Sequence, residues 1–195
     1  MRTLRDKLSG RPEPEKRRAA LIVPLVLQGE DLQILFERRA ENLRRSSAEV
    51  GFPGGIVEDG ENPFQAALRE LKEETGIEEG RVSLLGRLPQ LGHRAAVEQI
   101  IPFVCLLEGP VDLSVQGQEV AELFFVPLSF LMERGFNAAQ LIETLTLSPD
   151  FPQQLLPGGS WQRRTVRPVY YLQYREKLIW GLSAEIVVSL LALLA

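Results

Sequence analysis

The stretch GIVEDGENPFQAALRELKEETGI, residues 55–77, predicts a short amphipathic helix with clear ends. Asn62 is a favourable N-cap, and Pro63 suits the first helical position. Gln65 stands where a capping box needs it, and Gly76 is placed as the left-handed residue that ends a helix. The stretch therefore combines a turn-rich approach, a helix and a defined stop.

Three glutamates gather on one side of this helix. With about 100° of rotation per residue, Glu70, Glu73 and Glu74 share an arc roughly 100° wide. The opposite, mainly apolar face carries Phe64, Ala67, Leu68, Leu71 and Thr75. A solvated acidic face is one explanation, but carboxylates at i and i+4 repel by roughly 0.2–0.5 kcal/mol, which a divalent cation would remove. Because hard oxygen ligands occur here without a histidine or cysteine cluster, Mg²⁺ or Mn²⁺ is the expected cofactor.

The segments before the helix predict a hairpin followed by a loop. Residues 19–27 and 32–38 are apolar runs separated by QGED, which favours two antiparallel strands. Pro24 is expected at an edge or a bulge, since proline cannot donate to a strand ladder. Residues 40–55 read as a loop that starts basic and ends in GFPGG, whose glycines permit a positive φ or a close backbone approach.

Downstream, strands alternate with helices without a regular βαβ repeat. Strands are expected within 81–88, 99–108, 122–128 and 169–174, a short helix at 130–136, a turn-rich stretch at 152–168 and a final helix from Ser183. This order favours an α/β or α+β fold, a mixed β-sheet sandwiched between helices, over a doubly wound fold.

Composition predicts one globular domain. The 195 residues are 45% hydrophobic and 25% charged, with a net charge of −4. We expect an N-terminal arm at 1–18 and a single domain at 19–195. The acidic balance argues against a nucleic-acid partner. We expect a cytoplasmic protein, because Cys105 is the only cysteine and the sequence does not start with an apolar leader. The C-terminus is apolar but is interrupted by Glu185, which favours a buried helix or a homodimer contact over a membrane span.

The helix and its approach resemble the Nudix box, G-x5-E-x7-REU-x-EE-x-GU, in which U is a bulky aliphatic residue. The matching positions are Gly55, Glu61, Arg69, Glu70, Leu71, Glu73, Glu74, Gly76 and Ile77. A chance match to the seven fixed letters is expected about once in 10⁸ positions. The resemblance implies a pyrophosphatase of the Nudix superfamily.

The upstream sequence is similar to a motif of coenzyme A pyrophosphatases within that superfamily, LLTxR[SA]-x3-R-x3-G-x3-FPGG. The residues in register are Leu35, Arg39, Ala40, Arg44, Phe52, Pro53, Gly54 and Gly55. Phe36, Glu37 and Ala48 depart from the pattern, replacing leucine, threonine and glycine. The resemblance, which extends from about residue 20 to the C-terminus, implies hydrolysis of coenzyme A to 3′,5′-ADP and 4′-phosphopantetheine or its derivative.

The same resemblance assigns roles to individual residues. Glu70 and Glu74 are the expected metal ligands, with Glu73 as a third, and Arg69 orients these carboxylates through a salt bridge. Glu119 is the candidate general base, and Glu122 is the alternative. Phosphate contacts are expected from Arg39, Arg44 and Arg38, near Phe52, Gly54 and Gly55.

Other readings of the sequence stay open. An intact box also serves hydrolases of ADP-ribose, dinucleotides and oxidised nucleoside triphosphates. A nucleotide-sensing binding module without catalysis is an alternative of another class. His93, the single histidine, is a weaker candidate for substrate binding or proton transfer, and Cys105 in PFVCLL is a weak candidate nucleophile because its strand is expected to be buried.

Overall fold

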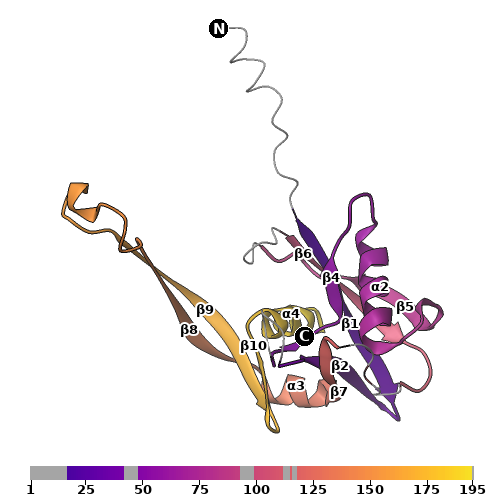
Figure 1. Ribbon diagram of the computed structural model, residues 1–195. Coiled ribbons are helices and arrows are strands. Elements are labelled where there is room, and N and C mark those ends of the chain that lie inside the picture. Colours follow the sequence, from indigo (N-terminus) through magenta and orange to yellow (C-terminus); the bar gives the residue numbers. More distant parts are fainter. Residues whose placement is uncertain (1–16, 42–47, 93–98, 112–114, 116–117, 195) are drawn as a thin grey trace, which may run out of the picture.

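The computed structural model describes residues 17–41, 48–92, 99–111, 115 and 118–194 (Figure 1). Within these residues the chain forms a seven-stranded mixed sheet and a three-stranded antiparallel sheet. Helices cover both faces of the larger sheet, so the expected mixed sheet sandwiched between helices is confirmed. Of the expected N-terminal arm, residues 1–16 lie outside the described residues.

The predicted N-terminal hairpin is present. Strand β1 spans Arg18–Gln28 and pairs antiparallel with β2, Asp31–Arg39. Gly29 takes a φ of +65° in the connecting turn, a conformation that glycine adopts without steric cost. On its other side β1 runs parallel to β6, Gln99–Leu107, which makes β1 a central strand.

Pro24 was expected at an edge or a bulge, but β1 is a central strand and its pairings show no register shift at Pro24, so that expectation was wrong. Ile22 N–H donates to Pro53 O at 3.0 Å, and pairing with β2 begins only at Leu25. Pro24 therefore falls in the interval where β1 changes partner from β4, Gly54–Ile56, to β2. Because no partner strand accepts a hydrogen bond there, the missing N–H leaves the ladder intact.

The remaining strands complete the larger sheet. Strand β7 pairs with the outer side of β2, and β5 pairs with β6 at the opposite side, both antiparallel. A short strand, β3, lies against the end of β2 beside the loop. Their bounds, with those of two short helices, are β3 Val50–Gly51, β5 Val82–Arg87, β7 Val120–Pro127, η1 Glu79–Arg81 and α3 Leu128–Arg134.

Alternating side chains of β1 divide the core into two layers. Ala20 and Ile22 point toward helix α2, Pro63–Thr75, whereas Val23 points toward helix α4, Gly181–Leu194. The two helices therefore lie on opposite sides of the sheet (Figure 1). Side chains that alternate across a strand explain how one sequence run supplies both layers.

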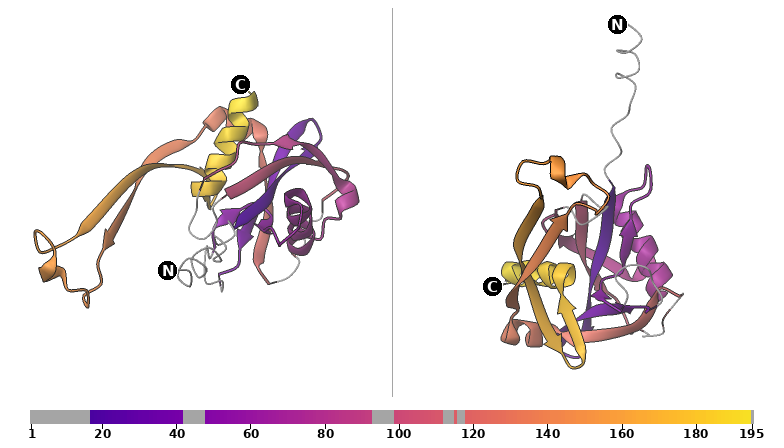
Figure 2. Two further views of the ribbon diagram at one scale, coloured as in Figure 1. Left: turned by 90° about the horizontal axis from the view of Figure 1, so that it is seen from above. Right: turned by 60° about the vertical axis from the view of Figure 1, so that its left-hand side comes forward.

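The second sheet consists of β8, Asn137–Thr146, β9, Gln162–Tyr174, and β10, Lys177–Trp180. The β8–β9 hairpin extends far from the body in Figure 1 and in the left view of Figure 2. The last part of the stretch 152–168, which was expected to be turn-rich, thus belongs to the long strand β9, and η2, Gln153–Leu155, lies in the connection between β8 and β9.

Helix α4 is a packed helix rather than a free apolar tail. Ala184, Ile186 and Val187 are almost fully buried in the same core cluster as Val23. Ser183 Oγ donates to the carbonyl oxygen of Val50 at 2.8 Å, which ties the start of α4 to β3. Among the described residues, no helix has the length and apolar character needed to cross a membrane.

Candidate active site

Both ends of α2 are capped, which fixes the side of the helix on which its glutamates lie. Asn62 Oδ1 accepts from Phe64 N–H at 2.9 Å, and Gly76, with φ +73°, donates from its N–H to Lys72 O at 2.8 Å. The Gln65 side chain instead donates to Glu79 Oε1 at 3.4 Å, so it does not complete the expected capping box. The helix nevertheless starts and stops at the predicted residues.

Two glycines bring the preceding loop into contact with the glutamates. Gly54 N–H donates to Glu74 Oε2 at 3.0 Å. A methyl group at Gly55 would lie 2.3 Å from Glu70 Oε1, and one at Gly54 would lie 2.6 Å from the carbonyl oxygen of Ala20. Neither glycine is among those with a positive φ. Close approach, rather than backbone conformation, therefore explains why glycine stands at both positions.

Arg69 joins the loop to the helix through its guanidinium. Its Nε donates to Glu61 Oε1 at 3.1 Å, and its Nη1 donates to Glu70 Oε1 at 2.8 Å. The hydrogen bonds raise the pKa of Arg69 and lower that of Glu61, so both stay charged. Glu73 is 62% exposed, with its Oε1 3.8 Å from Arg69 Nη1. Arg69 therefore fixes the direction of Glu70 more firmly than that of Glu73.

Glu74 and Glu37 form a buried acidic pair. Burial raises the pKa of Glu74 to about 9, and the nearby charge of Glu37 adds to that shift against the hydrogen bond from Gly54. Burial likewise raises the pKa of Glu37 to about 7, opposed by the charge of Arg39. Two carboxylates in one poorly hydrated place bind protons or cations more strongly than exposed ones do.

One arginine serves three of these acids. Arg39 Nη1 lies 3.7 Å from both Glu37 Oε1 and Glu74 Oε1, and its Nη2 donates to Glu119 Oε2 at 3.1 Å. Of the two base candidates, Glu119 thus adjoins the acidic group. Glu122 has other partners. It accepts a hydrogen bond from Arg38 Nε at 3.3 Å and pairs with Lys177 Nζ at 3.0 Å.

Comparison with known proteins assigns this arrangement to a family. The NUDIX domain family matches residues 15–145 of the chain. The chain belongs to the NUDIX family.

Its relatives include two proteins described as uncharacterized Nudix hydrolase NudL. The one from Pectobacterium atrosepticum is 31% identical over 91% of this chain and 82% of its own length. The one from Photorhabdus laumondii is 32% identical over 90% of this chain and 87% of its own length.

Solved structures show the same Nudix fold. A MutT/nudix family protein from Enterococcus faecalis matches with a TM-score of 0.52 and 14% identity, over 100% of this chain and 69% of that chain. A binary complex of the C. elegans Ap4A hydrolase matches with a TM-score of 0.50 and 21% identity, over 59% of this chain and 83% of that chain. At such low identity the likeness concerns the fold alone.

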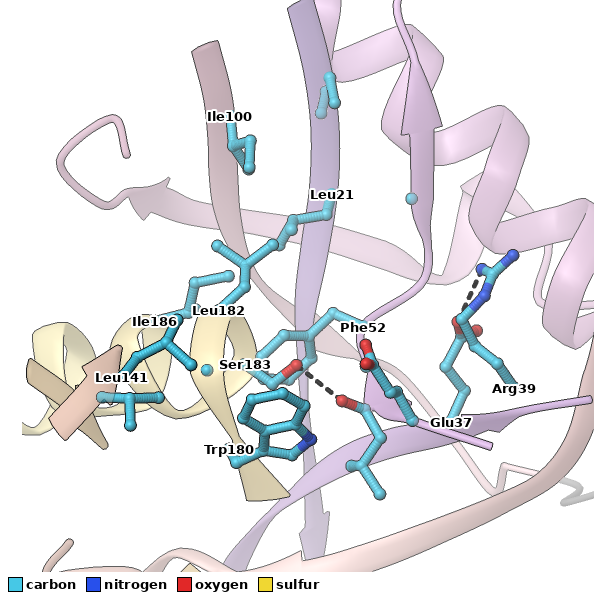
Figure 3. A pocket seen from close by; sticks show the side chains of 18 of the residues that line it. Leu21, Glu37, Arg39, Phe52, Ile100, Leu141, Trp180, Leu182, Ser183 and Ile186 are labelled. Atoms are coloured by element: carbon cyan, nitrogen blue, oxygen red, sulfur yellow. Dashed lines mark hydrogen bonds and ion pairs between the residues drawn. The ribbon is translucent and has the colours of Figure 1, made fainter. Parts of the chain in front are cut away.

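A cavity of about 450 Å³ adjoins the Nudix box. At one end lie Glu37, Arg39 and Gly54, of which Arg39 and Gly54 contact Glu74 of the box. Figure 3 shows that the cavity then runs over Phe52, whose ring stacks on Phe36 at 4.8 Å, toward an apolar end. That end is lined by Leu141 of β8, Val169 of β9, and Trp180, Leu182 and Ile186 at the junction of β10 and α4.

The donor set fits a hard divalent cation. In the described part of the chain no three acidic, histidine or cysteine side chains are already grouped tightly enough to hold a metal. Arg39 and Arg69 lie between the carboxylates. However, Glu37 Oε2 is buried without a hydrogen-bond partner, and Glu74 is buried beside it. Carboxylate oxygens in such a place match the ligands that Mg²⁺ and Mn²⁺ prefer.

The structure separates the other sequence candidates. Arg44 and His93 lie outside the described residues. Cys105 is fully buried in β6, and burial raises the pKa of its thiol to about 12, which argues against a nucleophile. Ala48 takes a φ of +58°, so alanine here adopts the left-handed conformation that glycine favours.

Sequence reasoning missed Glu37 as a site residue. It lies on β2 with its side chain at the carboxylate end of the cavity (Figure 3). The sequence carried two signals for Glu37. It is an ionisable residue directly after the apolar run Ile34–Phe36, and it stands where the motif of coenzyme A pyrophosphatases has threonine.

Proposed function

We propose that this Nudix protein hydrolyses the pyrophosphate bond of coenzyme A or its derivatives, using Mg²⁺ or Mn²⁺. The products would be 3′,5′-ADP and 4′-phosphopantetheine or its derivative. The observation that carries the proposal is the cavity, which joins a charged end at the Nudix box to an apolar end against α4. Coenzyme A has the same order, because its pyrophosphate links a phosphorylated nucleoside to a long, less polar pantetheine arm.

The box glutamates are the proposed metal ligands. Glu70 and Glu74 converge on the loop glycines, and Glu73 extends toward solvent as a third ligand. Arg69 keeps Glu70 directed toward the loop. When bound, the cation would offset the charge of the pyrophosphate and activate water for attack on phosphorus.

Two further groups complete the proposed reaction. Glu119 is 65% exposed and bonded only through its Oε2 to Arg39 among the described contacts, so its side chain has room to accept the proton of the attacking water. Arg39, together with Arg38 and Arg44, is proposed to hold phosphate oxygens, a task that suits the planar guanidinium. Phe52, Gly54 and Gly55 form the wall along which the substrate lies.

The upstream motif is the second support for coenzyme A. Leu35, Arg39 and Phe52 match the motif of coenzyme A pyrophosphatases, and Arg39 and Phe52 line the cavity. Leu35 does not line it and is buried in the sheet on the side of α2. The motif thus supplies a cationic group at the charged end of the cavity and an aromatic ring in its wall.

Substrate competition tests the proposal. The purified protein is incubated with coenzyme A, ADP-ribose, NADH and dGTP in Mg²⁺, in Mn²⁺ and in chelator, and the products are identified by mass. Metal-dependent release of 3′,5′-ADP from coenzyme A is expected. Cleavage of ADP-ribose or a triphosphate alone would refute the substrate, and cleavage of none would favour a binding module.

Location and assembly are further expectations. We place the enzyme in the cytoplasm because Cys105 is the only cysteine in the chain and disulfides belong to oxidising compartments. Residues 19–195 are taken as one domain, with no nucleic-acid or membrane partner. A homodimer contact through α4 is tested by sedimentation of the purified protein.

A further inference from the structure

Glu37 has an unusual position for a charged residue. Its side chain is only 1% exposed, on a strand between Phe36 and Arg38. Its Oε2 is the one buried side-chain nitrogen or oxygen, in the part of the chain that the structure describes, without a hydrogen-bond partner. An ionised carboxylate without a partner in such a place costs several kcal/mol, so a compensating charge is expected nearby.

The positively charged side chains near Glu37 are already shared among several carboxylates. Arg39 Nη1 lies 3.7 Å from Glu37 Oε1 and the same distance from Glu74 Oε1, while its Nη2 bonds to Glu119. The next guanidinium, that of Arg69, is shared by other acids, including Glu70. One arginine beside three carboxylates leaves an excess of negative charge around Glu37.

The side chain of Glu37 lies at the cavity beside the box. Glu37 lines the cavity together with Arg39 and Gly54, and Gly54 is the residue that donates to Glu74. In Figure 3 the carboxylate of Glu37 lies next to Arg39 at that end of the cavity, away from the apolar side chains of α4. A cation held by Glu74 would therefore stand within reach of a second carboxylate that comes from the sheet.

We propose that Glu37 is a ligand of the divalent cation at this site, adding a carboxylate from β2 to those that α2 supplies. Position 37 is not part of the Nudix box, and the similar upstream motif has threonine there, so the ligand is a feature of this chain. The inference rests on the proposed function only in requiring a divalent cation. It deepens that function by giving the cation a ligand on each side of the loop Phe52–Gly55.

The test measures Mn²⁺ binding directly, by the loss of the free Mn²⁺ signal in electron paramagnetic resonance. Glu37→Gln keeps the shape of the side chain and removes its charge, and Glu37→Thr restores the residue of the motif. Both are expected to weaken Mn²⁺ binding at least tenfold. Glu143→Gln is the matched control, since Glu143 is 55% exposed on β8, and it should bind Mn²⁺ as the wild type does.

Thermal melting separates a ligand from a structural residue. In chelator, Glu37→Gln should melt at or above the wild-type temperature, because a buried carboxylate whose Oε2 has no hydrogen-bond partner has been replaced by a neutral amide. In saturating Mn²⁺ it should gain less than the wild type, because ligand binding stabilises the folded state in proportion to its affinity. A lower melting temperature in chelator, with a retained gain from Mn²⁺, would assign Glu37 to packing and overturn the proposal.

The outcomes also separate this inference from the proposed function. If Glu74→Gln loses Mn²⁺ and Glu37→Gln keeps the wild-type affinity, the metal site stands and the role of Glu37 is refuted. If both lose Mn²⁺ but coenzyme A is not cleaved by the wild type, the substrate is wrong and the ligand assignment stands. If the wild type does not bind Mn²⁺, both are overturned.

Discussion

Gly55→Ala is predicted to disable the site without unfolding the protein. The new methyl group would lie 2.3 Å from Glu70 Oε1 and 2.4 Å from its carboxylate carbon. Ordinary contact begins at 3.4 Å, so the carboxylate oxygen must retreat by 3.4 − 2.3, about 1.1 Å. A misplacement of about 1 Å can cost on the order of 10²-fold in rate. We therefore expect kcat/KM to fall about 10²-fold.

The stability of this variant should change little. The atoms that obstruct the methyl group belong to the far end of a flexible side chain, which can rotate away. Gly54→Ala is the contrasting case, because its methyl group would lie 2.6 Å from both Ala20 O and Leu21 Cα. That contact with backbone should lower the melting temperature markedly. Gly80→Ala, with no atom within 4 Å of its new methyl group, is the neutral control.

The assay combines metal-dependent pyrophosphate hydrolysis with thermal melting of all three variants. Wild-type turnover by Gly55→Ala would refute the reasoning, because it would show that the position of Glu70 does not matter. A melting temperature reduced as far as that of Gly54→Ala would show that Gly55 serves packing instead. We expect Gly55→Ala to lose activity, Gly54→Ala to lose stability, and Gly80→Ala to lose neither.

Three further predictions concern charge and specificity. Glu70→Gln and Glu74→Gln should each lower kcat at least about 10²-fold while keeping the fold, as measured by turnover and circular dichroism. In chelator, the free energy of unfolding should fall as pH rises from 4.5 through about 7 and on to about 9, because the folded state holds the Glu37 and Glu74 protons that the unfolded state releases. The slope is about 1.4 kcal/mol per pH unit for each proton, and denaturant titrations at several pH values should show it disappear in saturating Mn²⁺. Trp180→Ala should raise KM for coenzyme A about tenfold with kcat unchanged, since the lost apolar contact is worth roughly 1–2 kcal/mol.

Local signals explain why the box helix could be predicted residue by residue. Asn62 and Gly76 act within one turn of the chain, and the structure uses both. The hairpin of β1 and β2 was accessible for the same reason, because its turn connects adjacent residues. Pro24 was misplaced because the sequence does not reveal where a central strand changes partners.

The β8–β9 hairpin was missed for a different physical reason. Strand predictions depend on alternation between buried and exposed residues, and nearly every residue of Asn137–Thr146 is exposed. Its order comes from pairing with β9, in which Asn137 lies opposite Tyr171. In the described part of the chain the hairpin lines the cavity through Leu141, Arg167 and Val169. The part that shapes the site thus comes from pairing over long sequence distances.

The sequence predicted which site residues lie together only where they come from a single segment of the chain. The glutamates of α2 share a helix, so their convergence follows from its period. Glu37 and Glu119 join them from two other segments, and Arg39 connects both to Glu74. That connection depends on the pairing of β2 with β7, which no local pattern specifies.

The charge of the assembled site limits how a pyrophosphate can enter it. Glu37 lines the cavity, Glu70 and Glu74 lie beside it, and the guanidiniums nearest to them, those of Arg39 and Arg69, are already paired with acids, so an anion arriving alone meets little free positive charge. A divalent cation reverses that balance. Because binding free energies are reciprocal, whatever the cation adds to the affinity for substrate, the substrate adds to the affinity for the cation. The end against α4 is mainly apolar, although Arg167 also lines it, so it can hold the less polar part of a substrate while the acidic end admits the pyrophosphate together with its metal.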